Sequence, residues 1–402
     1  MQRLHIARGL VFELNPIMSG TEPKAEQPST AKQDSPAELG SPAAKQDSPA
    51  EPGGLAKADS PTPGREAAAA PSAPLPPEHW AQIQQDDEEH ERDSALGDDA
   101  ASSTASLTSS ILHYRTIKGR TFHSERGNAQ YWGTNDDSHS ESLDILHHLF
   151  TLCLEGELHL APIKEPRKIL DIGTGTGIWA IDMADKFPDC EVIGTDISPI
   201  QPTWVPPNLK FEIEDCTQDW TFPAGEFDLV HIRYLLGCIV DWTAFFKQAY
   251  RCCKPGGYLE SYEASPMVLS DDGTLPETSA TAQWSQLFIE GGKAIGRSFT
   301  IVDEGIQKKA MEEAGFVDVQ EKNIKVPSGG WSADPKLKEI GLFAQMAVHQ
   351  DIEGFILFLT VALKWSEEQV QVYMAHLRRE FRAGKFHAYY WQKVVWGRKP
   401  EA

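Results

Sequence analysis

The sequence of 402 residues lacks three features that would each point to a particular class of protein. No hydrophobic run approaches the roughly 18 apolar residues that a membrane-spanning helix needs. The six cysteines include no Cys-x-x-Cys pair, so buried free thiols explain them better than a zinc site or a disulfide framework. Basic residues are few, with 37 Lys and Arg against 59 Asp and Glu and a net charge of -22. We therefore expect an intracellular protein with no membrane segment, no metal site and no direct contact with nucleic acid.

The first quarter of the chain has little of what a hydrophobic core requires. Between residues 19 and 110, large apolar side chains are sparse among Ala, Pro, Ser, Asp, Glu and Gln. So little apolar surface cannot offset the entropy lost on folding, and we predict a disordered tail over residues 1–110. The tail repeats Ala-Lys-Gln-Asp-Ser-Pro-Ala-Glu at 31–38 and 44–51. These repeats carry no apolar stripe that could stack into a core, which is typical of a linker.

The chain does contain one glycine-rich stretch around which the rest is organised. Residues 168–177 read Lys-Ile-Leu-Asp-Ile-Gly-Thr-Gly-Thr-Gly. The apolar run at 169–172 predicts a buried strand, the glycines predict a tight turn, and the apolar pattern from Ile178 predicts a helix. Glycine lets a ligand approach the main chain closely, and the first turn of a helix offers unpaired N–H groups. This half of a βαβ unit is therefore a candidate site for a nucleotide or a carboxylate.

Strand and helix patterns alternate after this turn, which predicts a parallel sheet with its ligand at the carboxyl ends of the strands. Further strands are expected at 191–196, 209–213, 227–233, 258–262, 316–326 and 389–396. Helices are expected from 141, from a cap at Asp241 to a stop at 254–257, at 303–314, and over most of 331–381, with a capping box of Ser366 and Gln369. We expect an ordered domain at 111–402, made of a core at 165–265 and a cap at 266–402.

Side chains at the ends of the predicted strands are candidates for cofactor contacts. Asp196 ends the second strand, where an acid accepts hydrogen bonds from ribose hydroxyls in nucleotide-binding α/β folds. Asp215 follows the third strand, where a side chain could meet the base of the same nucleotide. His231 lies near the end of the fourth strand, and it is the best placed general base if an acceptor must lose a proton. The alternative, that His231 and Arg233 only line or brace the pocket, remains open.

The spacing of the glycines distinguishes two common cofactors. A dinucleotide site has the pattern Gly-x-Gly-x-x-Gly, which would need glycine at position 178, where this chain has Ile178. Gly-x-Gly-x-Gly preceded by Asp171 resembles the class I S-adenosylmethionine-dependent methyltransferases. The resemblance extends over 168–261 and includes the Lys-Pro-Gly-Gly of 254–257. It implies an α/β, Rossmann-like, seven-stranded mixed sheet with helical cap insertions, and S-adenosyl-L-methionine as the cofactor.

Further motifs narrow the resemblance. Tyr131-Trp132, His147-His148, Leu-His-Leu-Ala-Pro at 158–162 and Gly-Arg-Lys-Pro at 397–400 are similar to fungal methyltransferases grouped with the secondary-metabolism regulator LaeA. This similarity covers about residues 114–400. By family analogy it places the protein in the nucleus or the cytoplasm.

The resemblance also implies a set of cofactor contacts. Asp171 and the glycine backbone would hold the methionine moiety, Asp196 the ribose, and Asp215 with Cys216 the adenine edge. An aromatic face over the sulfonium would contribute about 0.5 to 2 kcal/mol, and Tyr131 and Trp132 are the candidates; the alternative is that both are core aromatics. The residues expected to bind the cofactor are Tyr131, Trp132, Asp171, Gly173, Thr174, Gly175, Gly177, Asp196, Ile197, Asp215, Cys216 and His231.

We therefore interpret the chain as an S-adenosylmethionine-dependent methyltransferase whose acceptor is a small molecule or a protein linked to fungal secondary metabolism. An interpretation from a different class is a non-catalytic regulatory protein that retains the cofactor-binding fold and acts through partners. The sequence indicates neither the acceptor nor the oligomeric state.

Overall fold

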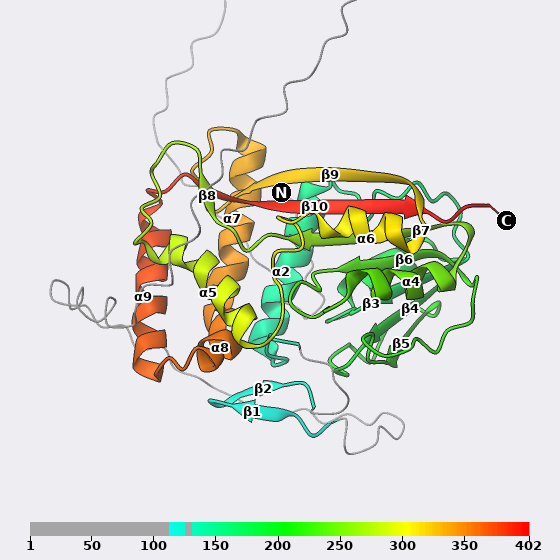
Figure 1. Cartoon of the computed structure of the whole chain (residues 1–402), viewed down its shortest axis with the longest axis horizontal. Helices are drawn as coiled ribbons and strands as arrows, with labels where there is room; N and C mark the ends of the chain where they lie inside the picture. Colours follow the sequence, from blue (N-terminus) through cyan, green and yellow to red (C-terminus); the bar gives the residue numbers. More distant parts are fainter. Residues whose placement is uncertain (1–111, 125–130, 402) are drawn as a thin grey trace, which may run out of the picture. The chain divides into compact units, whose positions relative to one another are not determined.

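The computed structural model describes residues 112–124 and 131–401, so the predicted disordered tail lies outside the described residues. Within these residues, an eight-stranded mixed sheet has the order β5-β4-β3-β6-β7-β10-β8, and β9 pairs with β10 (Figure 1). The strands are β3 (Lys168–Ile172), β4 (Glu191–Asp196), β5 (Leu209–Ile213), β6 (Phe227–Arg233), β7 (Cys253–Ala264), β8 (Leu269–Ser270), β9 (Val317–Pro327) and β10 (Ala388–Arg398). A separate ribbon consists of β1 (Arg115–Ile117) and β2 (Arg120–Phe122).

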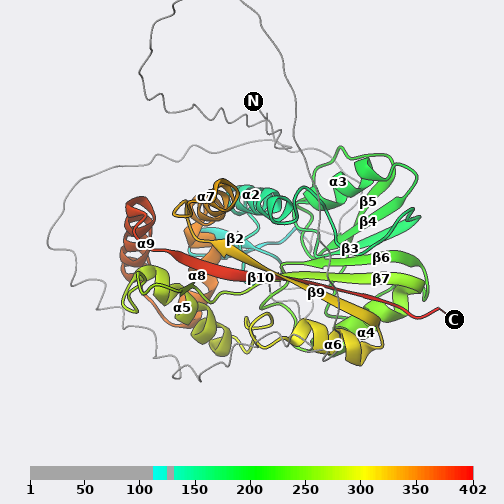
Figure 2. The same ribbon diagram turned by 90° about the horizontal axis from the view of Figure 1, so that it is seen from above.

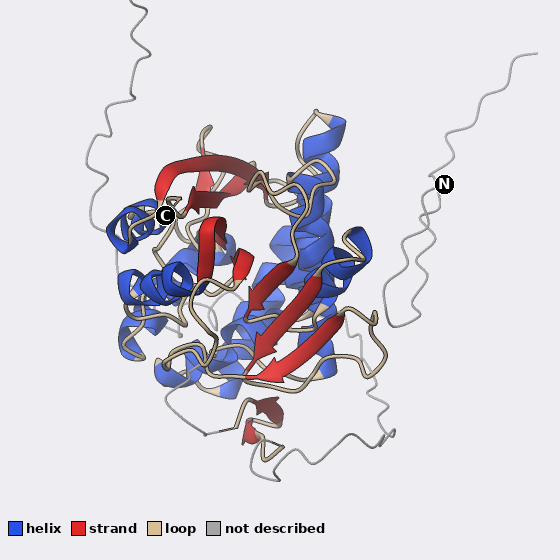
Figure 3. Ribbon diagram, turned by 90° about the vertical axis from the view of Figure 1, so that its right-hand side faces the viewer, coloured by secondary structure: helices blue, strands red, loops and turns tan. Residues whose placement is uncertain are grey.

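The sheet is parallel from β5 to β7 and antiparallel where β10 joins β7 and β9. The mixed α/β fold is therefore confirmed, with all seven expected strands present. The eighth strand, β8, has only two residues and pairs with Ala388 and Tyr389 at the start of β10. Figure 3 shows the parallel strands side by side with helices on both sides.

The helices form two layers on the sheet and a separate group beyond one end of it. They are α2 (Asp137–Cys153), α3 (Ile178–Lys186), α4 (Trp242–Cys252), α5 (Ala280–Ala294), α6 (Ile306–Ala314), α7 (Pro335–Gln350), α8 (Ile352–Ala362) and α9 (Glu367–Ala383). Figure 2 shows α2, α3 and α7 on one side of the sheet and α4 and α6 on the other. Helices α5, α8 and α9 pack on one another and form the cap.

Two predicted helix caps are present. The Asp241 carboxylate accepts a hydrogen bond from the Ala244 N–H, and Ser366 forms the expected capping box with Gln369. Several boundaries differ from the expectation by one to five residues, and two of them differ most. Helix α2 begins four residues early because Asp136 caps it, and β7 begins at Cys253, so the Pro-Gly-Gly of 255–257 lies inside an irregular strand rather than before it.

The core lies on both faces of the parallel strands. In β3, Ile169 packs in one buried cluster with Trp179 and Met183 of α3, whereas Leu170 belongs to a second cluster on the α4 side with Phe246. Burial on both faces explains why β3 is a continuous apolar run instead of an alternating one. All six cysteines are free thiols, and five of them are buried. None of the helices in residues 112–124 and 131–401 has the length and apolar character needed to cross a bilayer.

Candidate functional site

A cavity lies at the carboxyl ends of β3, β4, β5 and β6, where a parallel α/β sheet places its ligand. Its empty volume is about 1120 Å³, part of which is open to solvent. The residues predicted as cofactor contacts that line it are Tyr131, Asp171, Gly173, Thr174, Gly175, Asp196, Ile197, Asp215 and Cys216. The structure therefore brings together nine of the twelve predicted residues, and Trp132, Gly177 and His231 do not line the cavity.

The glycine turn needs its glycines for two different reasons. Gly173 has a φ of 70°, and a Cβ there would lie 2.7 Å from a methyl carbon of Leu235, so a side chain would clash with this residue of the cavity wall. Gly177 has a φ of 83° and caps α3, and a Cβ there would lie 2.4 Å from the ring of Phe211. Gly177 thus allows α3 to pack close to β5, and it does not line the cavity.

Two carboxylates at this edge are held by the turn itself. Asp171 accepts a hydrogen bond from the Thr174 hydroxyl at 2.7 Å. Asp196 accepts the backbone N–H of Gly175 at 2.9 Å on one oxygen and that of Ser198 at 2.9 Å on the other. Burial raises the pKa of Asp196 to about 6, although these N–H groups act in the opposite direction. Asp196 is therefore mostly ionised at neutral pH and able to accept further hydrogen bonds.

His231 lies behind the cavity wall. Its Nδ1 is 2.7 Å from Asp171 Oδ1, and its ring stacks on Trp179 at a centroid distance of 3.6 Å. Burial lowers the pKa of His231 to about 4, although Asp171 raises it. A neutral ring in this place orients Asp171. The position fits the bracing alternative and not a base that reaches an acceptor.

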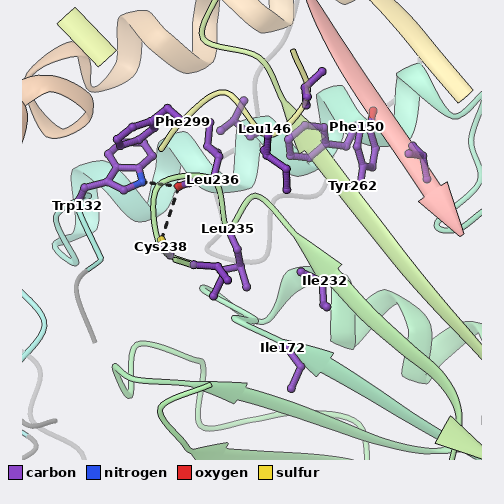
Figure 4. Packing of buried hydrophobic residues seen from close by; sticks show 14 of the residues in the cluster. Trp132, Leu146, Phe150, Ile172, Ile232, Leu235, Leu236, Cys238, Tyr262 and Phe299 are labelled. Carbon is purple, nitrogen blue, oxygen red and sulfur yellow. Dashed lines mark hydrogen bonds between the residues drawn. The ribbon is translucent and has the colours of Figure 1, made fainter. Parts of the chain in front are cut away.

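The two aromatic residues before α2 lie in different places, one in the cavity wall and the other in the core. Tyr131 lines the cavity, with its hydroxyl oxygen 3.2 Å from His139 Nε2. Trp132 is fully buried, donates its indole N–H to the Leu236 carbonyl at 2.8 Å, and lies beside Phe299 (Figure 4). Trp132 is thus a core residue here, as the alternative interpretation held.

Arg233 is a cavity residue to which the sequence assigned no specific contact. It lies at the end of β6, and burial lowers its pKa. One of its amino groups donates to His147 Nδ1 at 3.2 Å, and its guanidinium carbon lies 5.0 Å from the centre of the Phe150 ring. Among the described residues, no carboxylate forms an ion pair with Arg233. Arg233 is only partly buried, and Asp171, Asp182 and Glu260 favour its charged form without forming an ion pair with it, so its guanidinium is able to bind a ligand that brings a negative charge.

The turn after β6 forms another part of the wall. Tyr234, a cavity residue, has a φ of 60°, which is unusual for a residue other than glycine. The buried Glu263 carboxylate holds this turn by accepting the N–H groups of Leu235 at 3.0 Å and Leu236 at 2.9 Å. Strained backbone held in this way is a feature of functional sites. The sequence contains no signal for it, because Glu263 lies 28 residues away from Leu235.

Five of the remaining cavity residues that sequence reasoning missed come from α2 and its entry. They are Thr134, Asn135, Leu143, Leu146 and Phe150. The apolar members belong to the stripe that predicts α2, so the signal for a helix was present. Nothing in that stripe distinguishes a side chain that faces a ligand from one that faces the core.

The polar groups of the cavity match the parts of a nucleoside that carries an amino-acid arm. Asp196 suits ribose hydroxyls, Asp171 suits an ammonium group, and the guanidinium of Arg233 suits a carboxylate. Gly173 has no side chain and therefore exposes its main chain to the same cavity. The residues present therefore fit S-adenosyl-L-methionine.

Comparisons with known proteins agree with this geometry. The chain matches the family described as "Methyltransferase domain" over residues 145–321. It is 38% identical over 305 residues to the methyltransferase pytC of Aspergillus terreus, covering 75% of this chain and 93% of that protein. It is 32% identical over 274 residues to the secondary metabolism regulator laeA of Fusarium oxysporum f. sp. lycopersici, covering 66% and 86%.

A match among solved structures is phosphoethanolamine N-methyltransferase 2 of Haemonchus contortus, in complex with phosphomonomethylethanolamine and S-adenosylhomocysteine. It is 20% identical with a TM-score of 0.35, and the match covers 65% of this chain and 52% of that chain.

The sequence relatives and the strand order define a methyltransferase with the class I fold, whose cofactor is S-adenosyl-L-methionine. Within that class, the chain belongs to the fungal methyltransferase family that includes pytC and the LaeA regulators.

Proposed function

We propose that this protein is an active enzyme that transfers the methyl group of S-adenosyl-L-methionine to an acceptor bound beside the cofactor. The observation that supports catalysis is a second cavity, which shares Leu146, Phe150 and Tyr234 with the first. A protein that only retained the cofactor fold would need no such space next to it. The names of the relatives include both a methyltransferase and a regulator, so they do not decide between the two.

Each part of the first cavity has a proposed role. Asp196 accepts hydrogen bonds from the ribose, Asp215 and Cys216 meet the adenine edge, and Ile197 packs beside them. Asp171 and the backbone of Gly173 hold the amino group of the methionine arm.

Bound S-adenosyl-L-methionine supplies a methyl group on a positively charged sulfur, so the protein needs mainly to align the acceptor and exclude water. His231 contributes by fixing the orientation of Asp171, since a hydrogen bond of 2.7 Å joins His231 Nδ1 to Asp171 Oδ1. We propose this positioning role in place of the general-base role, since His231 lines neither cavity.

Arg233 is proposed to bind the carboxylate of the methionine arm. Arg233→Met removes the guanidinium and keeps a side chain of similar length, so it should weaken the binding of S-adenosyl-L-methionine. A hydrogen bond to a charged group contributes about 1.5 to 3 kcal/mol, which corresponds to about a 10- to 150-fold change in Kd. Isothermal titration calorimetry with the full chain measures this change.

The matched control for Arg233→Met is a ligand, 5′-methylthioadenosine, which has the nucleoside but no carboxylate. Its Kd should be the same for wild type and variant. Equal losses for both ligands would show that Arg233 supports the shape of the cavity and does not bind the carboxylate.

The proposal of catalysis is tested with the full chain, S-adenosyl-L-methionine and an apolar small-molecule extract of the source organism. We expect binding of the cofactor and formation of S-adenosylhomocysteine that depends on the extract. A chain that does not bind the cofactor is not an enzyme of this kind. Binding without turnover in any extract would favour the regulatory alternative.

A further inference from the structure

The second cavity lies between the sheet and the cap helices and has an empty volume of about 800 Å³. Its lining residues come from α2, β10, the segments around β7, and helices α5, α7, α8 and α9. They are Leu146, Phe150, Tyr234, Leu236, Ala264, Ser265, Pro266, Val268, Thr281, Trp284, Phe288, Ser328, Ala344, Val348, Phe355, Leu377, Phe381, Tyr390 and Gln392. We propose that this cavity binds an uncharged, mainly apolar small molecule that carries one carbonyl or ether oxygen. As the methyl acceptor, this molecule rests on the proposed function.

The charge of the lining excludes ionic acceptors. No Asp, Glu, His, Lys or Arg is among the described residues that line the cavity, and most of its members are aliphatic or aromatic. Moving an ionised group from water into such a space without a partner is strongly unfavourable. Small-molecule sites typically have this composition, an apolar lining with a few polar groups that fix orientation.

A chain of hydrogen bonds orients one polar group of the lining, the Tyr390 hydroxyl. The Tyr262 hydroxyl donates to Gln392 Oε1 at 2.6 Å, and Gln392 Nε2 donates to the Tyr390 hydroxyl at 3.3 Å. The Tyr390 oxygen is thereby an acceptor, and its own proton has no acceptor among the described residues. Gln392 is fully buried, so the direction of the chain is set inside the protein. Tyr390 is left to donate one hydrogen bond to whatever occupies the cavity, which is why we assign a carbonyl or ether oxygen to the ligand.

A third cavity adjoins the second. It shares Thr281, Ser328 and Phe381 with the second cavity and has an empty volume of about 680 Å³. Glu380 lines it, and its carboxylate accepts the N–H groups of Ala280 and Thr281 at 2.9 and 2.8 Å. An anionic acceptor that entered through the third cavity would be repelled by the Glu380 carboxylate. This is a second reason to expect an uncharged acceptor.

Three naphthalene derivatives test the proposal by isolating each property. They are 2-acetylnaphthalene (neutral, with a carbonyl), 2-ethylnaphthalene (neutral, without it) and 2-naphthoate (an anion), titrated into the full chain with detection by tryptophan fluorescence. Wild type should bind the ketone at least about tenfold more tightly than the anion. Tyr390→Phe should weaken binding of the ketone by about three- to tenfold and leave the affinity for 2-ethylnaphthalene unchanged.

The location is tested by filling the cavity. Ala344→Trp places a large side chain in the cavity from α7 and should abolish binding of the ketone, and Val348→Phe, a smaller change on the same helix, should weaken it. Met346→Trp is the matched control, because Met346 lies on α7 but is 41% exposed and lines none of the three cavities. Titration with S-adenosyl-L-methionine shows which variants remain folded.

Three results would overturn the inference: tighter binding of 2-naphthoate than of the ketone, equal effects of Tyr390→Phe on ketone and hydrocarbon, or ketone binding that survives both cavity-filling variants. Each of these can occur while S-adenosyl-L-methionine still binds, which leaves the proposed function intact. Loss of cofactor binding by wild type would instead refute the proposed function, and the naphthalene titrations would still report on the cavity.

Discussion

Replacing Asp196 with alanine is expected to weaken the binding of S-adenosyl-L-methionine by about 100-fold or more. The carboxylate lies beside Gly175 and Ser198, whose N–H groups it accepts, and it lines the cavity at the end of β4. Loss of two hydrogen bonds to a charged group corresponds to at least about 3 kcal/mol, which is about 150-fold in Kd. Isothermal titration calorimetry measures the change.

The control for Asp196 is Glu191→Ala, which removes an acid from the other end of the same strand. Glu191 forms ion pairs with Lys168 and Lys210 at the surface and is far from the carboxyl edge, so cofactor affinity should not change. If Asp196→Ala binds the cofactor as tightly as Glu191→Ala does, the assignment of the ribose contact is wrong.

The pH dependence of binding gives a second measurement of Asp196. Its pKa is held at about 6, so the carboxylate becomes protonated and loses acceptor capacity as the pH falls through that value. Affinity of the wild type should therefore decrease from about pH 7 to about pH 5, whereas Asp196→Asn should show no such decrease.

Asp351→Ala is expected to lower the free energy of unfolding by about 3 to 5 kcal/mol, the usual result of removing one partner from a buried ion pair. Asp351 accepts hydrogen bonds from both amino groups of Arg120 at 2.9 Å and from His139 at 3.2 Å. It also caps α8 by accepting the Gly354 N–H. The variant would remove the contacts of Arg120 in β2 and of His139 in α2 with the start of α8, while Arg120 keeps its ion pair with Asp136. Chemical denaturation of the full chain measures the loss.

Asp334→Ala is the matched control, because Asp334 also caps a helix, α7, but is exposed and forms no ion pair with any residue that the structure describes. It should lose only about 1 kcal/mol. Equal losses for the two variants would mean that the ion pair with Arg120 contributes nothing.

The sign of the pH effect on Asp351 follows from its pKa. Burial opposes ionisation, but the hydrogen bonds from His139 and Arg120 and the charge of Arg120 outweigh burial and hold the pKa below its usual range. The stabilisation is therefore present above the pKa of the unfolded chain, about 4, and is lost as the pH falls through the folded value. Asp351→Ala should accordingly lose less additional stability on acidification than wild type.

Much of the fold could be predicted because its signals are local. Three examples are the apolar run of β3, the glycine turn and the cap at Asp241. Each of these signals involves residues only a few positions apart, and the structure contains the elements that they indicate. The sequence did not indicate β8, since two residues carry no periodic pattern and pair only because β10 extends beyond β7.

The candidate site could be predicted where a side chain lies at the carboxyl end of a strand or just after it. Asp171, Asp196 and Asp215 are of this kind, and all three line one cavity. The positions of Trp132 and His231 could not be predicted, because an aromatic or a histidine near a site packs equally well behind its wall. Whether it faces the ligand depends on neighbours such as Phe299 and Trp179, which come from distant segments.

The sequence alone determined the class of fold and the cofactor, since glycine spacing and the acids at strand ends act through the backbone nearest to them. Only the tertiary structure decided what surrounds the acceptor. The second cavity draws its lining from α2, α7, β10 and the cap helices, and the direction of the Tyr390 hydroxyl is set by Gln392 and, through it, by Tyr262, which is 130 residues from Gln392 in the chain. Burial and the direction of a hydrogen-bond chain are properties of packed segments, and no spacing in the sequence encodes them.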